Sequence, residues 1–345
     1  MVSYHTTPEL LRLVTGMNCP GVAYHTTVRN QTDDGKNLTV VTVGADSPRK
    51  LSAKDKLRIM LTFGIHGREY FASEVALRYV PRGHLLPSIA LCSPRIAPDG
   101  RTNECHRRYI TTLCDGSTRS TQILEKVAFA MVPVMNPSGR SRTDETDASG
   151  DRTVGLDEQQ CSDRRKNANL VDLNRNFDVS WDLADGASSS QSQEDYRGPS
   201  PMSETETWTA SNLADDFEPD MYIDLHTGTI AMYRPWNYQS SEVDGEAAAN
   251  MTNFMNGIVD GTYEDGTSIW DGSALGVDDW RKPDAGVGGV ISYLASGTCA
   301  ASPVQPPTFS PFCCACHGCE LAGLVDLRAA SQSGRCYVPE EFCQV

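Results

Sequence analysis

Short apolar runs alternate along the chain with segments whose apolar residues have helical spacing. The runs, each five to eight residues long, are Leu38–Val43, Leu57–Phe63, Val127–Val134 and Met221–Leu225. Runs of this length are typical of buried strands. Glu69–Tyr79 instead spaces its apolar residues as the inner face of a helix, with Phe71, Val75, Ala76 and Tyr79 on that face. The alternation of strands and helices predicts an α/β fold with a largely parallel sheet covered by helices.

Side chains with metal-binding chemistry follow two of these strands. His66 and Glu69 stand three residues apart, just after the strand that ends at Phe63, and His226 follows the strand that ends at Leu225. Open α/β sheets place their sites at the carboxyl ends of strands, so we expect these three side chains to meet. Two histidines and one carboxylate are a ligand set of catalytic zinc, which keeps a fourth position open for water. The sequence therefore predicts a zinc site.

The remaining pattern predicts further helices and loops. Asn136-Pro137-Ser138-Gly139 is typical of a turn after a strand. Residues 140–164 are polar and irregular, which predicts a long surface loop. Ser203–Glu206 has the residues of a helix start, and the helix is expected to reach about Leu213. Glu246–Val259 predicts another helix.

Composition and charge narrow the classes of function. The chain has 345 residues, of which 39% are hydrophobic and 22% charged, as in an ordinary globular protein. A net charge of −15 argues against nucleic acid as a partner, because phosphate backbones need a basic surface. No apolar stretch has the length needed to cross a bilayer, so no membrane span is expected.

The cysteine count points to an oxidising compartment. Twelve cysteines spread from Cys19 to Cys343 favour disulfides. Three glycosylation-acceptor triplets, which begin at Asn30, Asn37 and Asn250, agree with this reading. No signal peptide is visible at the start of the chain. We expect an extracellular, secretory or vacuolar enzyme whose targeting segment is missing or lies outside this chain.

Taken together, the motifs resemble the zinc metallocarboxypeptidase family of the carboxypeptidase A and B type. They occur in the family's order from about residue 1 to Trp280 and cover most of the chain. The matching segments are Gly64–Glu69, Val132–Gly139, Arg165–Asn167, Val171–Phe177, Arg197–Pro199, Ser203–Glu206, Asp224–Thr227 and Tyr233–Pro235. The resemblance implies a single domain over residues 1–345, with three α/β/α layers around a twisted mixed sheet.

The resemblance also implies roles for individual residues. His66, Glu69 and His226 would hold one zinc ion, which polarises the scissile carbonyl. Asn174 and Arg175 would bind the free carboxylate of a peptide C-terminus, because a guanidinium offers paired donors that fit a carboxylate. Two further arginines complete the set: Arg165 would stabilise the oxyanion, and Arg68 would line the neighbouring subsite.

Two residues would bear on substrate choice. Gly276–Trp280 resembles a family segment whose first aspartate pairs with basic C-terminal residues in enzymes similar to carboxypeptidase B. Asp278 would do so here, or it is a solvated acid on a loop; the sequence leaves both open. Trp270 stands roughly where the family has a mobile tyrosine, and its indole can donate a hydrogen bond but cannot act as a phenol.

The family's general base is a glutamate on a late strand, and this chain has none at the expected distance. Gly288–Leu294 starts like that strand, but a Pro- and Cys-rich tract around residues 297–323 follows it. Leu324–Arg328 comes only afterwards, so Asp326 would replace the glutamate, one methylene shorter. The alternatives are Glu320 as base, or no base at all. Cys313–Cys319 within the tract would form disulfides or free thiols rather than a second metal site.

We predict a zinc carboxypeptidase that removes single C-terminal residues from peptides and acts as a monomer. Two other functions fit the same residues. A related branch of zinc amidohydrolases acts on acylated amino acids and shares His-x-x-Glu with a later histidine. An inactive zinc-binding module that holds peptide C-termini would also carry these motifs.

Overall fold

The computed structural model describes residues 5–17, 19, 21–45, 56–79, 113–114, 116–144, 158–183, 186–227, 231–233, 253, 290 and 323–329. For 231–233 and 323–329 it describes the backbone. No helix among the described residues is long and apolar enough to cross a membrane.

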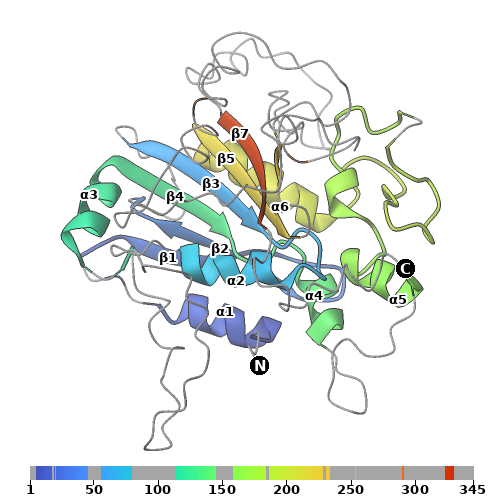
Figure 1. Cartoon of the computed structure of the whole chain (residues 1–345), viewed down its shortest axis with the longest axis horizontal. Coiled ribbons are helices and arrows are strands. Elements are labelled where there is room, and N and C mark those ends of the chain that lie inside the picture. Colours follow the sequence, from blue (N-terminus) through green and yellow to red (C-terminus); the bar gives the residue numbers. More distant parts are fainter. Residues whose placement is uncertain are drawn as a thin grey trace, which may run out of the picture.

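A twisted sheet of seven described strands forms the centre of the molecule (Figure 1). The strands are β1 Tyr24–Gln31, β2 Asn37–Val43, β3 Leu57–Phe63, β4 Val127–Val132, β5 Met221–Thr227, β6 Ala231–Tyr233 and β7 Gly323–Ala329. Their order is β1-β2-β4-β3-β5-β7-β6. The four central strands β4, β3, β5 and β7 run parallel, and the outer pairings are antiparallel. The sheet is therefore mixed, with its parallel strands in the middle.

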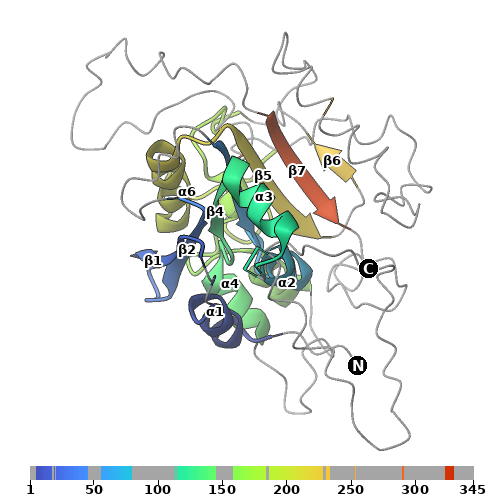
Figure 2. The same cartoon turned by 90° about the vertical axis from the view of Figure 1, so that its left-hand side faces the viewer.

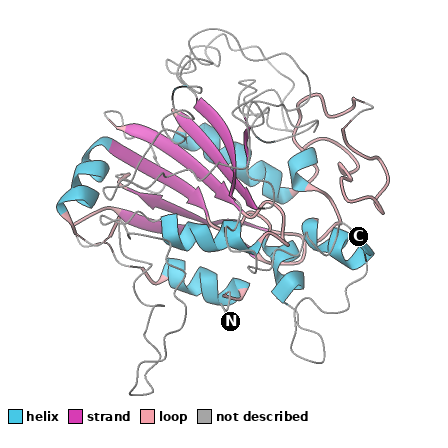
Figure 3. Ribbon diagram, viewed as in Figure 1, coloured by secondary structure: helices cyan, strands magenta, loops and turns pink. Residues whose placement is uncertain are grey.

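Helices cover both faces of this sheet (Figure 3). They are α1 Thr7–Thr15, α2 Tyr70–Tyr79, α3 Thr118–Lys126, α4 Pro137–Asp144, α5 Glu158–Arg165 and α6 Thr205–Phe217, with a short 3-10 turn at Leu173–Arg175. When the molecule is turned by 90°, α6 lies on one side of the sheet and α1 and α2 on the other (Figure 2). The predicted three-layer α/β/α architecture is confirmed.

Two hydrophobic clusters fill the space between the layers, because successive residues of a strand point to opposite faces. Met60 belongs to the cluster under α6, together with Leu213 and Phe217 of that helix. The next residue, Leu61, belongs to the opposite cluster, together with Leu10 of α1 and Ala76 of α2. The central strands are thus buried on both faces, which explains why their sequences are continuous apolar runs.

The strands predicted from the apolar runs are confirmed, and so is helix α2. The helix expected after Ser203–Glu206 is also present, but it continues to Phe217. The elements α1, β1, β6 and the 3-10 turn had no prediction. β1 is half-buried along most of its length, so it lacks the apolar run that marks the central strands. On β1, the side-chain amide of Asn30 donates a hydrogen bond to Thr209 of α6 at 2.9 Å. The amide nitrogen to which a glycan would be attached in the Asn30 triplet is therefore used in a contact with α6.

The prediction of a long loop over residues 140–164 is wrong at both ends. Asn136 is the last residue before α4, and its side-chain oxygen accepts a hydrogen bond from the backbone N–H of Gly139 at 2.8 Å. Pro137 then occupies the first helical position, where its missing N–H costs nothing. At the other end, residues from Glu158 form α5. Both helices are polar in sequence, so hydrophobic spacing could not predict them.

Arg140 shows how α4 is held despite its polarity. Its guanidinium is buried, donates to Glu74 at 3.1 Å and to the carbonyl of Tyr70 at 3.2 Å, and stacks on the Tyr70 ring. It also donates to the carbonyl of His5 at 2.8 Å. Hydrogen bonds and an ion pair here take the place of apolar contacts between α4, α2 and the segment before α1.

One disulfide joins the segment after α1 to the segment before α3. Cys19 and Cys114 are bonded, with Cα atoms 4.2 Å apart and a sequence separation of 95. Cys161 on α5 is also disulfide-bonded.

Candidate active site

The turn after β3 is built by two glycines. Gly64 has φ of +65°, which favours glycine, and the turn brings the chain back toward α4. Gly67 lies against the backbone of Gly139 and Arg140, so closely that an added Cβ would overlap it. Asn136 fixes the same turn, because its side-chain amide donates to the carbonyl of Ile65 at 3.2 Å and to that of Arg165 at 3.1 Å. The turn that carries His66 and Glu69 is therefore tightly positioned.

The three predicted metal ligands meet at the carboxyl ends of β3 and β5. These strands are hydrogen-bonded neighbours, with Phe63 opposite Leu225. One ligand atom from each of His66, Glu69 and His226 lies within 4.8 Å of the others, and all three side chains are buried. Within the part of the chain that the structure describes, these three side chains form a group close enough to share one metal ion.

Each histidine ring is oriented by a second carboxylate. His66 donates from Nε2 to Asp172 at 3.3 Å, and His226 donates from Nε2 to Asp224 at 2.8 Å. The Asp224 carboxylate accepts a further hydrogen bond from Thr62 at 2.6 Å. Carboxylates in this position fix the tautomer and the ring orientation of metal-binding histidines.

The orientation of the rings tests whether a metal fits. With Nε2 donating, a neutral ring turns the lone pair of Nδ1 toward Glu69, and the distances from Nδ1 to the Glu69 oxygens are 2.5 Å for His66 and 3.1 Å for His226. Two acceptors this close repel each other unless a cation or a proton lies between them. Two imidazole nitrogens and one carboxylate, converging in a buried place, fit the three protein ligands of a catalytic zinc.

Arg165, at the end of α5, lies directly beside this group. Its Nη1 is 3.2 Å from Nδ1 of His66, and its Nε donates to Asp172 at 2.9 Å. Burial acts to lower the pKa of Arg165, but Asp172, Glu194 and Glu69 outweigh it and raise the pKa. Burial likewise acts to raise the pKa of Asp172, and the charge of Arg165 together with the hydrogen bond from His66 holds that pKa well below its ordinary value. Both groups are therefore charged at neutral pH.

The predicted carboxylate-binding pair lies on the 3-10 turn Leu173–Arg175, next to Asp172. Asn174 is buried, and its side-chain oxygen accepts a hydrogen bond from the backbone N–H of Val290 at 3.0 Å. Arg175 donates to the carbonyl of Gly186 at 3.0 Å and to that of Asn174 at 2.9 Å. These carbonyls hold the Arg175 guanidinium, whose charge helps to lower the pKa of Asp172.

The remaining predicted arginine, Arg68, is buried within the turn that carries the ligands. Its Nη2 donates to Glu194 at 2.7 Å, and the same Glu194 oxygen lies 3.9 Å from Nε of Arg165. Burial acts to raise the pKa of Glu194, but the hydrogen bond from Arg68 and the charges of both arginines lower it. The two arginines predicted to face substrate thus share one carboxylate of the chain itself.

Asp326 lies on β7, whose backbone pairs in parallel with β5. In this register Asp326 stands opposite Asp224, and Arg328 stands opposite His226. The strand after the Pro- and Cys-rich tract therefore joins the sheet beside the strand that carries His226. Val290, in the segment expected to begin the family's late strand, is helical instead. Trp270, Asp278, Glu320 and Cys313–Cys319 lie outside the described residues.

Three residues of this site had no prediction: Asp172, Asp224 and Glu194. Asp224 stands two residues before His226 on β5, so both side chains face the same side of the sheet, and this spacing could have pointed to it. Asp172 lies within the matching segment Val171–Phe177, but no role was predicted for it. Glu194 comes from a separate loop, and no pattern in the sequence links it to the arginines.

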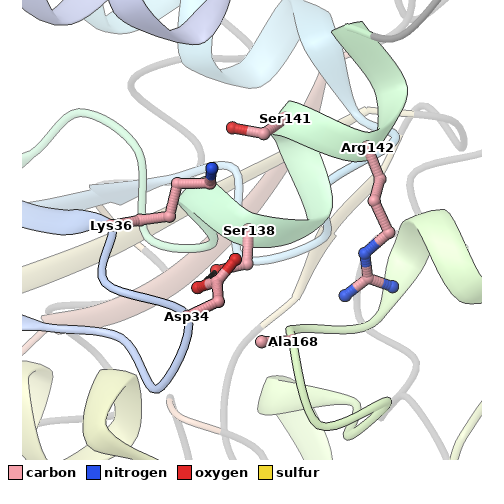
Figure 4. A pocket seen from close by; sticks show the side chains of 6 residues that line it. All are labelled: Asp34, Lys36, Ser138, Ser141, Arg142 and Ala168. Carbon is pink, nitrogen blue, oxygen red and sulfur yellow. Dashed lines mark hydrogen bonds between the residues drawn. The ribbon is translucent and has the colours of Figure 1, made fainter.

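A second, polar pocket lies away from the ligands, between the turn that joins β1 to β2, helix α4 and the segment after α5 (Figure 4). It has a volume of about 190 Å³ and is lined by Asp34, Lys36, Ser138, Ser141, Arg142 and Ala168. Ser138 donates to Asp34 at 2.6 Å, and Arg142 donates to the carbonyls of Asp163 and Asn167. These bonds tie α4 to the turn between β1 and β2, to α5 and to the segment after α5.

A family of known proteins matches part of this chain. The sequence model of the family described as zinc carboxypeptidase matches residues 102–288, a little over half of the chain. The matched segment contains Arg165, Asn174, Arg175 and His226, whereas His66 and Glu69 precede it.

Individual relatives agree with this match. A metallocarboxypeptidase A-like protein from Trichophyton verrucosum (strain HKI 0517) is 30% identical over 148 residues, which are 39% of this chain and 33% of that protein. Mast cell carboxypeptidase A from Rattus norvegicus is 31% identical over 124 residues, which are 34% of this chain and 27% of that protein. The chain thus spans about a third of the length of these curated relatives.

Solved structures share the fold at lower identity. Thrombin activatable fibrinolysis inhibitor superposes with a TM-score of 0.56 at 20% identity, over 87% of this chain and 65% of that one. Carboxypeptidase A from Helicoverpa armigera superposes with a TM-score of 0.54 at 17% identity, over 99% of this chain and 70% of that one.

Proposed function

The chain belongs to the zinc carboxypeptidase family, and on this premise we propose that it removes single C-terminal residues from peptides in a zinc-dependent reaction. The observation that carries the proposal is the meeting of His66, Glu69 and His226, with Arg165 beside them. A zinc ion held by these three side chains would polarise the scissile carbonyl and acidify the attacking water.

The chain's own residues would bind and orient the peptide around this centre. Arg175 and Asn174 bind the terminal carboxylate, because a planar guanidinium offers it paired hydrogen bonds. Arg165 stays cationic and stabilises the negative charge that develops on the carbonyl oxygen, which is worth roughly 3 kcal/mol in comparable sites. Asp326 accepts the proton of the attacking water and passes it to the leaving amine.

The preference for the C-terminal residue would depend on residues beyond the described part of the chain. We propose that Asp278 pairs with a basic C-terminal side chain and that Trp270 packs beside the substrate. The disulfide between Cys19 and Cys114 supports an oxidising compartment, outside the cell or in the secretory or vacuolar system. The protein would act as a monomer on peptide or protein C-termini.

A peptide-cleavage assay tests this function. Zinc-loaded protein is given peptides that end in Lys or Leu, and an acylated amino acid. We expect release of the C-terminal residue from the peptides, fastest from the one ending in Lys. Cleavage of the acylated amino acid alone would instead support the amidohydrolase, and peptide binding without any cleavage would support the inactive module.

A pair of variants tests the base. Asp326→Asn should lower kcat by about a hundredfold or more and leave peptide affinity unchanged, because a positioned general base contributes about 10²–10⁴-fold. Glu320→Gln is the matched control and should keep the activity of the natural chain. The reverse result would identify Glu320 as the base and contradict the role of Asp326.

A further inference from the structure

Glu194 is the outermost charge over two buried cations. The side chains of Arg68 and Arg165 are 4% and 11% exposed, whereas that of Glu194 is 45% exposed. Of these three charged groups, the Glu194 carboxylate is therefore the one most accessible from solvent. Its hydrogen bond from Arg68, at 2.7 Å, places it over that arginine.

The loop that carries Glu194 is held in place from below by a buried lysine. Lys166 donates to the carbonyls of Gln191 and Gln193, at 2.9 and 3.1 Å, and pairs with Asp163 at 3.2 Å. The side chain of Lys166 is fully buried, so these carbonyls compete little with water for its ammonium group. The carboxylate is thus a fixed charge, not one on a loosely attached segment.

The placement of Glu194 relates it to one side of the substrate. In the proposed function, Arg175 binds the terminal carboxylate and Arg165 faces the scissile carbonyl. Glu194 contacts Arg165 and Arg68, whereas Arg175 is held by the carbonyls of Gly186 and Asn174. A peptide that extends from Arg175 past Arg165 would bring its penultimate residue toward Glu194.

We propose that Glu194 is a specificity-determining residue, which makes the site favour peptides with a basic penultimate residue over peptides with an acidic one. This inference rests on the proposed function. An acidic side chain there would meet the fixed carboxylate and be repelled, and a basic one would be attracted. Hydrogen bonding from Arg68 and the nearby charge of Arg165 keep Glu194 ionised at neutral pH, despite its partial burial.

The expected size of the effect is modest, because the carboxylate is half exposed. A charge pair in such a position contributes about threefold to affinity. Attraction of one peptide and repulsion of the other should together change their ratio by about tenfold. A purely structural role, in which Glu194 only holds Arg68 in place, would change the affinity for both peptides equally.

Three peptides that differ only in the penultimate residue, Lys, Gln or Glu, test the inference with the zinc-loaded full chain. Dissociation constants are measured by fluorescence anisotropy, and kcat/KM is measured in parallel. We expect the natural chain to favour the Lys peptide over the Glu peptide by about tenfold. In Glu194→Gln this preference should disappear. Asp195→Asn, which removes one charge from the next residue of the same loop, should preserve it.

Salt provides a second measurement that needs no variant. Raising the ionic strength from 0.05 M to 0.5 M should reduce the Lys-to-Glu ratio of the natural chain, because salt screens charges at a half-exposed site. An unchanged ratio in Glu194→Gln, or an equal change in Asp195→Asn, would overturn the inference and leave the proposed function intact. If the natural chain neither binds nor cleaves any of the peptides, the proposed function fails and the inference fails with it.

Discussion

Asp224 sets the orientation of His226, one of the predicted zinc ligands. It is buried on β5, accepts from Nε2 of His226 at 2.8 Å, and is itself held by Thr62 at 2.6 Å. Tyr222 extends this buried chain, with its hydroxyl 2.5 Å from that of Thr62. The ring of His226 is therefore oriented by a series of groups that are not themselves among the three predicted ligands.

Replacing Asp224 should weaken zinc binding without removing a ligand. In Asp224→Asn we expect the zinc dissociation constant to rise by about 10–100-fold, because the lost charge makes the His226 ring a poorer and less firmly oriented ligand. Competition with a coloured chelator measures the constant directly, with no need for catalysis. Asp182→Asn, at an exposed position, is the control. Equal affinities in the two variants would show that Asp224 does not orient the ring.

Glu206, on the first turn of α6, makes stability depend on pH. Burial raises its pKa to about 7, and the nearby charge of Glu204 acts in the same direction. In the unfolded chain the pKa has its ordinary value of 4.5. The folded state binds the proton more tightly, so the stabilisation is complete below pH 4.5 and is lost as the pH rises through about 7.

From this shift we expect the free energy of unfolding to fall by about 3 kcal/mol between those two pH values. Urea unfolding at a series of pH values measures the fall. In Glu206→Gln, which resembles the protonated acid, this part of the pH dependence should vanish. Glu125→Gln on the exposed side of α3 should keep it. A pH dependence that persists in Glu206→Gln would assign it to other groups.

At the level of single residues, the sequence predicted the three metal-binding side chains that the fold brings together, but not the groups that hold them. His66, Glu69 and His226 stand out because their types and positions after strands match a known ligand set. No sequence pattern distinguishes Glu194, since acidic residues are common in polar loops. Its importance comes from the fold, which brings the loop over two arginines.

At the level of elements, the turn after β3 and the start of α4 depend on each other. Gly67 packs against the backbone of Gly139 and Arg140, where no side-chain movement can make room for a Cβ. Such a close approach is a usual reason for glycine.

We expect Gly67→Ala to push this turn away from α4 and to displace His66 and Glu69 together. The loss of stability should be about 2 kcal/mol or more, as for other overpacked positions. It should come with weaker zinc binding, because both ligands lie on the displaced turn. Denaturant unfolding and chelator competition measure the two effects. Ser141→Ala, on the same helix, should change neither, and a fully stable Gly67→Ala protein would contradict the packing argument.

The helices α4 and α5 show why element prediction failed where it did. Hydrophobic spacing reports elements that bury apolar side chains, and α4 instead buries Arg140, Ser138 and Thr143 through hydrogen bonds and an ion pair. Asn136-Pro137 is equally typical of a turn and of a helix start. The local sequence could not decide between them without the neighbouring Glu74.

At the level of the whole molecule, the parallel centre of the sheet explains why the site could be predicted. Strands β3 and β5 are neighbours and run in the same direction, so residues that follow both must meet at one edge. The strand order could not be predicted in the same way. It depends on which strands pair, and β4 lies between β2 and β3 although it follows both in the chain.

The bond between Cys19 and Cys114 closes a covalent ring around the first two ligands of the site. His66 and Glu69 lie inside this ring, and His226 lies outside it. A protease that cuts the backbone once between the two cysteines would leave both fragments tethered, so the ligands would still belong to one connected molecule. Such a nicked protein would separate into pieces only after treatment with a thiol reductant.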